Sequence, residues 1–350
     1  MSTPTVLVVC PGRGVYTKAE LGYLNRFGSN AFIAWADTER ERAGRTSVTA
    51  LDGASSYESD TYTRGDNAAG LIYSCSLLDF RAIDPHAFEV VAICGNSMGW
   101  YTALACAGAL DAEQGFKLAD TMGAMTHEMA PGGQCVHTTA DASWRISGER
   151  RAALMDAMAR AGALGKIEVS IELGAMVVFA GADAAIDAFI EAAPRGPQPF
   201  PFRLTNHGAF HTPLMAPISA RAKEVIPAQW FRAPRIPIID GRGKVWRPFS
   251  TDPAAIWDYT LGAQVVDTYD FNASVRVAMR EYAPDHVIVL GPGDTLGGAV
   301  IQSLIACQWD DIKDKAAFDA RQARAPLLIS MGRADQRRLV DSGGALNAAR

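Results

Sequence analysis

The stretch VVAICGNSMGWYTALACAGAL (residues 90–110) decides the expected fold of this chain. An apolar run typical of a buried strand breaks at GNSMG (residues 95–99), and a pattern of small residues typical of a helix follows. A strand-to-helix turn this tight leaves no room for side chains beside its central serine, so both flanking residues must be glycine. The stretch therefore predicts a nucleophile elbow that exposes Ser97 at a helix N-terminus, where free N–H groups favour negative charge.

The composition is that of a globular enzyme. Hydrophobic residues make up 49% of the 350 residues and charged residues 20%, which argues against disorder. A net charge of −5 without a basic block argues against nucleic acid as a partner, and no apolar run reaches the ~20 residues that span a bilayer. The six cysteines form no CxxC pair, so we expect reduced thiols in a soluble, cytoplasmic protein without a metal site.

The order of the expected elements predicts an α/β fold with two parts. A strand at residues 6–10, a buried helix over residues 68–80 and the strand before Ser97 indicate a parallel sheet with helices on both faces. Between residues 129 and 204 the order becomes βαββαβ, which is the ferredoxin-like pattern. We expect this subdomain to be inserted into a catalytic domain of residues 1–128 and 205–332, with the polar residues 333–350 as a loose tail.

A serine nucleophile needs a base, and histidine is the side chain best matched to neutral pH. Five of the six histidines have ordinary interpretations as surface, loop or strand-end residues. His211 differs because it lies in GAFHTPLM (residues 208–215), a small and partly apolar segment just after the last strand of the subdomain. Such a segment can fix one imidazole, so His211 is the predicted base.

Four motifs together resemble one family. GNSMGWYTALACAGAL, GAFHTPLM, the early PGRG and the late VLGPGDTLGGAV are similar, in the same chain order, to landmarks of the malonyl-CoA:acyl carrier protein transacylases and of polyketide synthase acyltransferase domains. The resemblance covers about residues 5–310. It implies an α/β-hydrolase-like acyltransferase core with an inserted ferredoxin-like subdomain, Ser97 as the acyl-accepting nucleophile and His211 as its base.

The resemblance also implies partners and a reaction. An acyl-CoA acylates the serine, CoA leaves, and the phosphopantetheine thiol of an acyl carrier protein takes the acyl group, in fatty acid or polyketide biosynthesis. CoA and phosphopantetheine are then substrates, and no cofactor is tightly bound. The main-chain N–H groups of Met98 and Arg13 would form the oxyanion hole, each worth about 2.7–4 kcal/mol to the transition state.

The chain departs from the family at the acyl-binding position. Malonyl-specific members carry an arginine on the helix after the elbow, and Met122 stands in its place. Because burying a carboxylate without a partner costs several kcal/mol, we expect a neutral acyl group. Arg13, which replaces the family's usual glutamine, is the one residue that could pair with a carboxylate from the opposite wall.

Other departures concern the surroundings of the serine. Asn96 and Trp100 replace the family's usual histidine and glutamate. Met98, Trp100, Met122 and Met125 could form an adaptable apolar pocket, although helix core is the ordinary interpretation of such residues. The expected substrate contacts are Gly12, Asn96, Trp100, Met122, Met176 and Phe210.

Asp270 is the candidate helper of the histidine. The family often has a glutamine or asparagine near the segment that corresponds to TYDFN (residues 268–272), and Asp270 takes that place. An aspartate there could orient His211 and stabilise its imidazolium. A helix N-cap is the alternative interpretation.

Two other functions fit the same motifs. Relatives that strip acyl groups from carrier proteins also lack the arginine, so an acyl hydrolase acting on carrier-protein thioesters is an alternative. A non-catalytic module that binds carrier proteins is another, although the presence of Ser97 and His211 argues against it. An ordinary α/β-hydrolase would need its acid between serine and histidine in the chain, and here the candidate acid follows the histidine.

Overall fold

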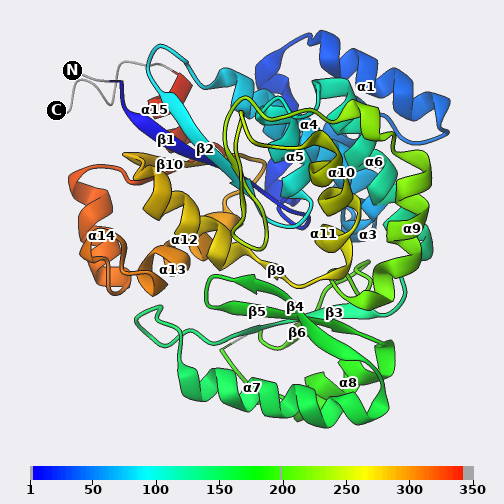
Figure 1. Ribbon diagram of the computed structural model, residues 1–350, viewed down its shortest axis with the longest axis vertical. Helices are drawn as coiled ribbons and strands as arrows, with labels where there is room; N and C mark the ends of the chain where they lie inside the picture. Colours follow the sequence, from blue (N-terminus) through cyan, green and yellow to red (C-terminus); the bar gives the residue numbers. More distant parts are fainter. Residues whose placement is uncertain (1–2, 198, 342–350) are drawn as a thin grey trace.

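The computed structural model describes residues 3–197 and 199–341, which form two sheets (Figure 1). The larger sheet has the strand order β11-β10-β1-β2-β7-β8, and every neighbouring pair is parallel except β7 and β8. Its strands, in chain order, are β1 (Thr5–Cys10), β2 (Glu89–Gly95), β7 (Ile238–Ile239), β8 (Val245–Trp246), β10 (His286–Val289) and β11 (Leu328–Ser330). The predicted α/β class is confirmed.

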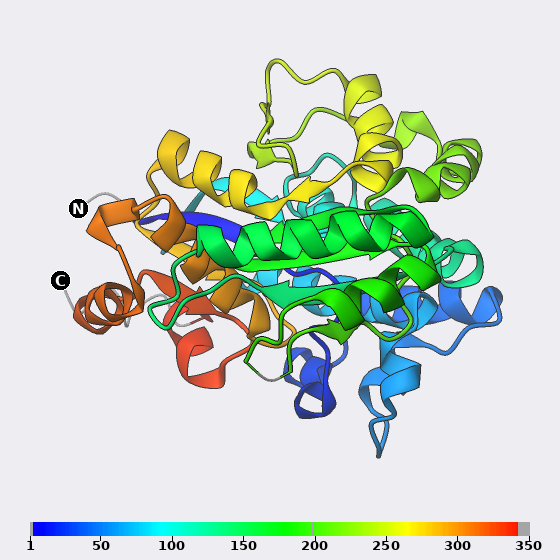
Figure 2. The same cartoon turned by 90° about the horizontal axis from the view of Figure 1, so that it is seen from below.

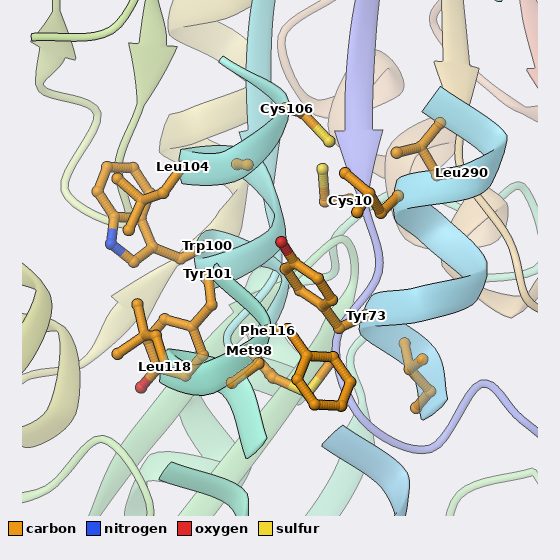
Figure 3. Packing of buried hydrophobic residues seen from close by; sticks show 14 of the residues in the cluster. Cys10, Tyr73, Met98, Trp100, Tyr101, Leu104, Cys106, Phe116, Leu118 and Leu290 are labelled. Atoms are coloured by element: carbon orange, nitrogen blue, oxygen red, sulfur yellow. The ribbon is translucent and has the colours of Figure 1, made fainter. Parts of the chain in front are cut away.

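Helices cover both faces of this sheet. Along β1, Val6 and Val8 pack into one core cluster, whereas Leu7 and Val9 pack into another. This alternation follows the two-residue period of a strand, and a strand buried on both faces needs the continuous apolar run that the sequence shows. The first face carries α4 (Gly65–Ala82), α5 (Gly99–Cys106) and α6 (Ala112–Met129), and the second carries α12 (Phe271–Tyr282) and α13 (Thr295–Ala306). Figure 3 shows part of the first cluster.

The second sheet belongs to the subdomain. Its elements follow the predicted order βαββαβ, namely β3 (Gly133–Thr138), α7 (Gly148–Ala161), β4 (Ile167–Leu173), β5 (Met176–Gly181), α8 (Asp183–Ala192) and β6 (Phe202–Arg203). One face packs on α7 and α8, which are the green helices at the front of Figure 2, and the other shares a core with α12 and α13.

A fifth strand joins the two parts. The sheet order is β6-β3-β5-β4-β9, and β9 (Tyr269–Asp270) comes from the segment after His211 and pairs in parallel with β4. A two-residue strand has no pattern of its own, so the sequence did not predict it. The division into residues 129–204 and the flanking segments stays a prediction.

The prediction that residues 333–350 form a loose tail is wrong for the first half of this segment. Residues 334–341 form α15 (Ala334–Asp341), which contacts β11, and its Val340 is fully buried. Residues 342–350 lie outside the described residues. An apolar side chain on one face of a short helix is enough to hold it against the sheet, and the polar composition of the segment conceals this.

The remaining elements lie around the two sheets. None of the helices in the described part of the chain is long and apolar enough to cross a bilayer. The other elements are η1 (Lys18–Glu20), η2 (Tyr23–Phe27), α1 (Ala31–Arg42), α2 (Val48–Asp52), α3 (Ser59–Thr63), η3 (Gly162–Leu164), η4 (Pro213–Met215), α9 (Ala216–Val225), η5 (Ala228–Trp230), α10 (Pro253–Leu261), α11 (Ala263–Val266), η6 (Trp309–Asp311) and α14 (Lys315–Arg324).

Candidate active site

Ser97 lies on the sharp turn between β2 and α5. Its φ of 53° is in the left-handed region, which a non-glycine residue adopts only when its surroundings impose it. A Cβ on Gly95 would come within 2.4 Å of the main-chain carbon of Gly99, and a Cβ on Gly99 within 2.2 Å of the Cys10 carbonyl oxygen. Both positions therefore require glycine, and the turn is a nucleophile elbow.

His211 stands beside this serine. Ser97 Oγ lies 2.7 Å from His211 Nε2, although 114 residues separate the two along the chain. His211 Nδ1 lies 2.8 Å from the main-chain oxygen of Gln264, and because a carbonyl can only accept, Nδ1 carries the proton. The lone pair of Nε2 therefore faces the serine hydroxyl.

The imidazole is set up as a base. His211 is 3% exposed, and burial lowers its pKa to about 4, although the hydrogen bond to the Gln264 carbonyl acts in the opposite direction. His211 is therefore neutral at pH 7 and able to take the proton of Ser97. Its φ of 56° is also in the left-handed region, so both residues of the serine–histidine contact have an unfavourable backbone conformation that the surrounding structure imposes.

Gln264 connects the two halves of this pair. Its Nε2 donates to the Ser97 carbonyl oxygen at 3.1 Å, and its Oε1 accepts from the Tyr101 hydroxyl at 3.1 Å. One buried residue thus fixes the elbow, the following helix and, through its own carbonyl, the imidazole. Sequence reasoning missed Gln264, although an amide side chain near the correct segment was a signal that could have led to it.

The prediction that Asp270 orients His211 is wrong. The Asp270 carboxylate accepts from Ala273 N at 2.8 Å and caps α12, which was the alternative interpretation. Burial, together with the charge of Glu172, raises its pKa. The pairing of β9 with β4 holds Asp270 opposite Glu172 at the edge of the sheet, and α11 brings Gln264 to the imidazole instead.

A pocket that is open to solvent lies at the serine, and like most small-molecule sites it is lined largely by apolar side chains. Its apolar wall comes from Met98, Tyr101, Met122, Phe210, Met215 and Val265. Two of the expected substrate contacts, Met122 and Phe210, therefore line it. Sequence reasoning missed Tyr101, Met215 and Val265, because they reach the pocket from three different elements.

Four of the expected substrate contacts do not line this pocket. Trp100 is fully buried, donates from Nε1 to Thr260 Oγ1 at 2.9 Å, and lies beside Leu104 in Figure 3. The face of α5 that carries it packs on α10, so the expectation for Trp100 is wrong. Met176 lies opposite Thr138 in the subdomain sheet and is also away from the pocket.

Gly12 and Asn96 hold two loops together. Asn96 N donates to the Cys10 carbonyl at 3.0 Å, and a Cβ on Gly12 would come within 2.7 Å of the Asn96 carbonyl oxygen. Their close backbone contact places the PGRG loop beside the elbow. The structure therefore gives both residues a role in shaping the site, and neither is among the residues that line the pocket.

The proposed oxyanion donors are available. Met98 and Arg13 both line the pocket, and within residues 3–197 and 199–341 neither main-chain N–H donates to another group. Their function as an oxyanion hole stays a prediction. The Arg13 side chain also lies at the pocket, where Nη2 donates to the carbonyls of Thr63 (2.6 Å) and Asn206 (2.9 Å).

The fold and the paired side chains define a class: an α/β protein with a serine on a nucleophile elbow, a neutral histidine beside it and a second sheet inserted next to the site. Comparison with known proteins narrows this class. No family model matches the chain. The malonyl CoA-acyl carrier protein transacylase of Escherichia coli O157:H7 is 27% identical over 234 residues, which are 65% of this chain and 71% of that protein.

Solved structures show the same fold. The malonyl-CoA:acyl carrier protein transacylase of Xanthomonas oryzae pv. oryzae matches with a TM-score of 0.74 at 20% identity, over 99% of each chain. A malonyl-transacylase in complex with its type II polyketide synthase acyl carrier protein matches with a TM-score of 0.72 at 16% identity, over 98% of this chain and all of that one. The resemblance to the malonyl-CoA:acyl carrier protein transacylase family is thus confirmed.

Proposed function

We propose that this protein is an acyltransferase that moves an acyl group from CoA to an acyl carrier protein through an ester on Ser97, in fatty acid or polyketide-type biosynthesis. The observation that carries the proposal is the 2.7 Å contact between Ser97 Oγ and His211 Nε2, on an elbow that opens into a pocket. The relatives named above, which are transacylases acting on an acyl carrier protein, support the choice of substrates.

The geometry gives each residue a step in the first half-reaction. Ser97 Oγ attacks the thioester carbonyl while His211 Nε2 takes the hydroxyl proton. The Gln264 carbonyl holds Nδ1–H and so stabilises the imidazolium that forms. The main-chain N–H groups of Met98 and Arg13 would donate hydrogen bonds to the carbonyl oxygen and so stabilise the negative charge that develops on it. The imidazolium then protonates the departing CoA thiolate.

The second half-reaction repeats these steps in reverse. The phosphopantetheine thiol of the carrier protein gives its proton to His211 and attacks the ester, and Ser97 leaves as the hydroxyl. Exclusion of water from the acyl-enzyme would favour this outcome over hydrolysis because water would compete for the same ester. The apolar wall formed by Met98, Met122, Met215 and Val265 supports transfer over hydrolysis.

Two features of the pocket bear on the acyl group and point in opposite directions. Met122 is buried on the wall and supplies no charge, which favours the neutral acyl group that the sequence predicts. Each methylene buried there would contribute about 0.8 kcal/mol. Arg13 lines the same pocket and favours an acyl group that ends in a carboxylate.

Intact-protein mass spectrometry after incubation with a panel of acyl-CoAs tests the proposal. We expect one acyl adduct per chain in the wild type, its disappearance when a holo carrier protein is added, and none in Ser97→Ala. An adduct that survives in Ser97→Ala would refute the assignment. An adduct that decays in buffer as fast as it does with carrier protein would instead identify an acyl hydrolase.

A further inference from the structure

Arg13 presents a cation to the acyl pocket without an anion to balance it. Its Nη2 donates to two main-chain carbonyls. Its Nε is buried without a hydrogen-bond partner, and Nη1 has no hydrogen-bond partner in the described part of the chain. The guanidinium lies over the Phe210 ring, 5.3 Å from its centroid. Two carbonyls and an aromatic face therefore fix its position before any ligand binds.

The charges around Arg13 leave it unneutralised. Burial lowers the pKa of Arg13 to about 10, and the carboxylate of Asp66 acts in the opposite direction. Asp66 is itself engaged by Arg64 at 2.8 Å, and no carboxylate in the described residues forms an ion pair with Arg13. His207 is held neutral because burial and the charge of Arg13 lower its pKa well below the usual value. At pH 7 the pocket thus contains a partly desolvated cation. The attraction of a bound anionic ligand would offset the free-energy cost of that desolvation.

The guanidinium of Arg13 lies where α4 crosses α6, the helix that carries Met122. A Cβ on Gly65 of α4 would lie 3.3 Å from Arg13 Nη1 and 2.4 Å from the carbonyl oxygen of Gly123 in α6. The two glycines let α4 and α6 approach so closely that a side chain on either would collide with the other helix. The guanidinium therefore lies near the backbone of Gly123, the residue after Met122. A long, charged side chain at position 122 would reach the same part of the pocket.

We propose that Arg13 binds the terminal carboxylate of the acyl group and is the residue that selects a dicarboxylic acyl-CoA in this pocket. The inference rests on the proposed function, because it concerns the acyl group that Ser97 accepts. It assigns a binding function to a side chain of the PGRG loop whose main-chain N–H is the expected oxyanion donor. One residue would then contact the acyl group at both ends, which fixes the distance between thioester and carboxylate and so limits the acyl chain length.

The test compares two donors of the same shape, malonyl-CoA and isovaleryl-CoA, which differ in whether the chain ends in a carboxylate or in two methyl groups. We expect the wild type to acylate Ser97 faster with malonyl-CoA. In Arg13→Gln the malonyl rate should fall about 10- to 100-fold, because a charge-assisted hydrogen bond is lost, while the isovaleryl rate changes less than about twofold. Arg247→Gln is the matched control, since it removes a half-exposed positive charge that pairs with Glu281 outside the pocket and should leave both rates unchanged.

Two further variants separate binding from bracing, because Arg13 also ties Thr63 to Asn206. Arg13→Lys keeps the charge and should retain the malonyl preference. Adding Met122→Arg to Arg13→Gln should restore malonyl transfer from the α6 side. Equal loss with both donors in Arg13→Gln, or a faster isovaleryl rate in the wild type, would overturn the inference.

A binding measurement distinguishes this failure from failure of the proposed function. In the Ser97→Ala background no acyl transfer takes place, and we expect Arg13→Gln to weaken malonyl-CoA binding about 10- to 100-fold relative to isovaleryl-CoA. If the wild type forms no adduct with either donor, the acyltransferase proposal fails, and this titration still reports on the carboxylate contact. Equal binding of malonyl-CoA with and without Arg13→Gln refutes the contact even if acyl transfer is intact.

Discussion

The turn at residues 95–99 and the segment at residues 261–272 both serve the Ser97–His211 pair, but they depend on the sequence in different ways. In the turn, backbone contacts dictate residue type, since a Cβ on Gly95 or Gly99 would collide with neighbouring main chain. In the later segment, the group that meets His211 is a main-chain carbonyl, which any residue could supply. The function of the first region can therefore be predicted from its residue types, whereas that of the second cannot.

Removing the base tests the centre of this comparison and has the largest expected effect. His211→Ala should slow acylation of Ser97 by about 10²–10⁴, because the serine hydroxyl loses the group that takes its proton. Affinity for acyl-CoA should change little. Stopped-flow or quenched-flow mass spectrometry measures the acylation rate, and an unchanged rate would mean that another group serves as the base.

Filling the turn tests the steric half of the comparison. Gly99→Ala should lower the free energy of unfolding by about 1–3 kcal/mol and impair acylation, because its Cβ would meet the Cys10 carbonyl oxygen at 2.2 Å. Gly298→Ala in α13 is the matched control: its Cβ would meet nothing within 4 Å, so we expect about 0.5–1 kcal/mol of stabilisation. Urea unfolding measures both. Equal stability of the two variants would show that the turn can relax.

Changing the later segment tests the other half. Gln264→Ala keeps the carbonyl that holds His211 but removes the side-chain bonds to Ser97 and Tyr101, so acylation should slow by roughly tenfold. Asp270→Asn should leave the rate within about twofold of the wild type, since the amide oxygen still caps α12. A slower rate in Asp270→Asn than in Gln264→Ala would reverse the assignment of the histidine's partner.

The pH profile is the smallest effect near neutrality and sharpens the same point. Because burial lowers the pKa of His211 to about 4, the base stays unprotonated well below the usual histidine value of about 6.5. The second-order rate constant of acylation should stay level from pH 8 to about pH 5 and fall as pH drops through about 4. A midpoint near 6.5 would contradict this, and Asp270→Asn should leave the midpoint unmoved.

The local patterns of the sequence determined much of the fold and part of the site. The elbow, the parallel sheet and the βαββαβ order follow from short runs in which the periodicity of apolar residues and the positions of glycines are visible in the local sequence. The choice of His211 among six histidines also followed from its neighbours in GAFHTPLM. In each case the residues that carry the signal are the ones that the structure constrains.

Only the tertiary structure decided how His211 is oriented and what lines the pocket. Gln264 reaches Ser97 across 167 residues and His211 across 53, and β9 carries Asp270 away from the imidazole. The side chain of Arg13 is placed by carbonyls of Thr63 and Asn206 and by the crossing of α4 and α6 at Gly65 and Gly123. The imidazole of His211 and the guanidinium of Arg13 are held by main-chain oxygens of distant segments, which every residue type supplies, so local sequence patterns do not reveal these contacts.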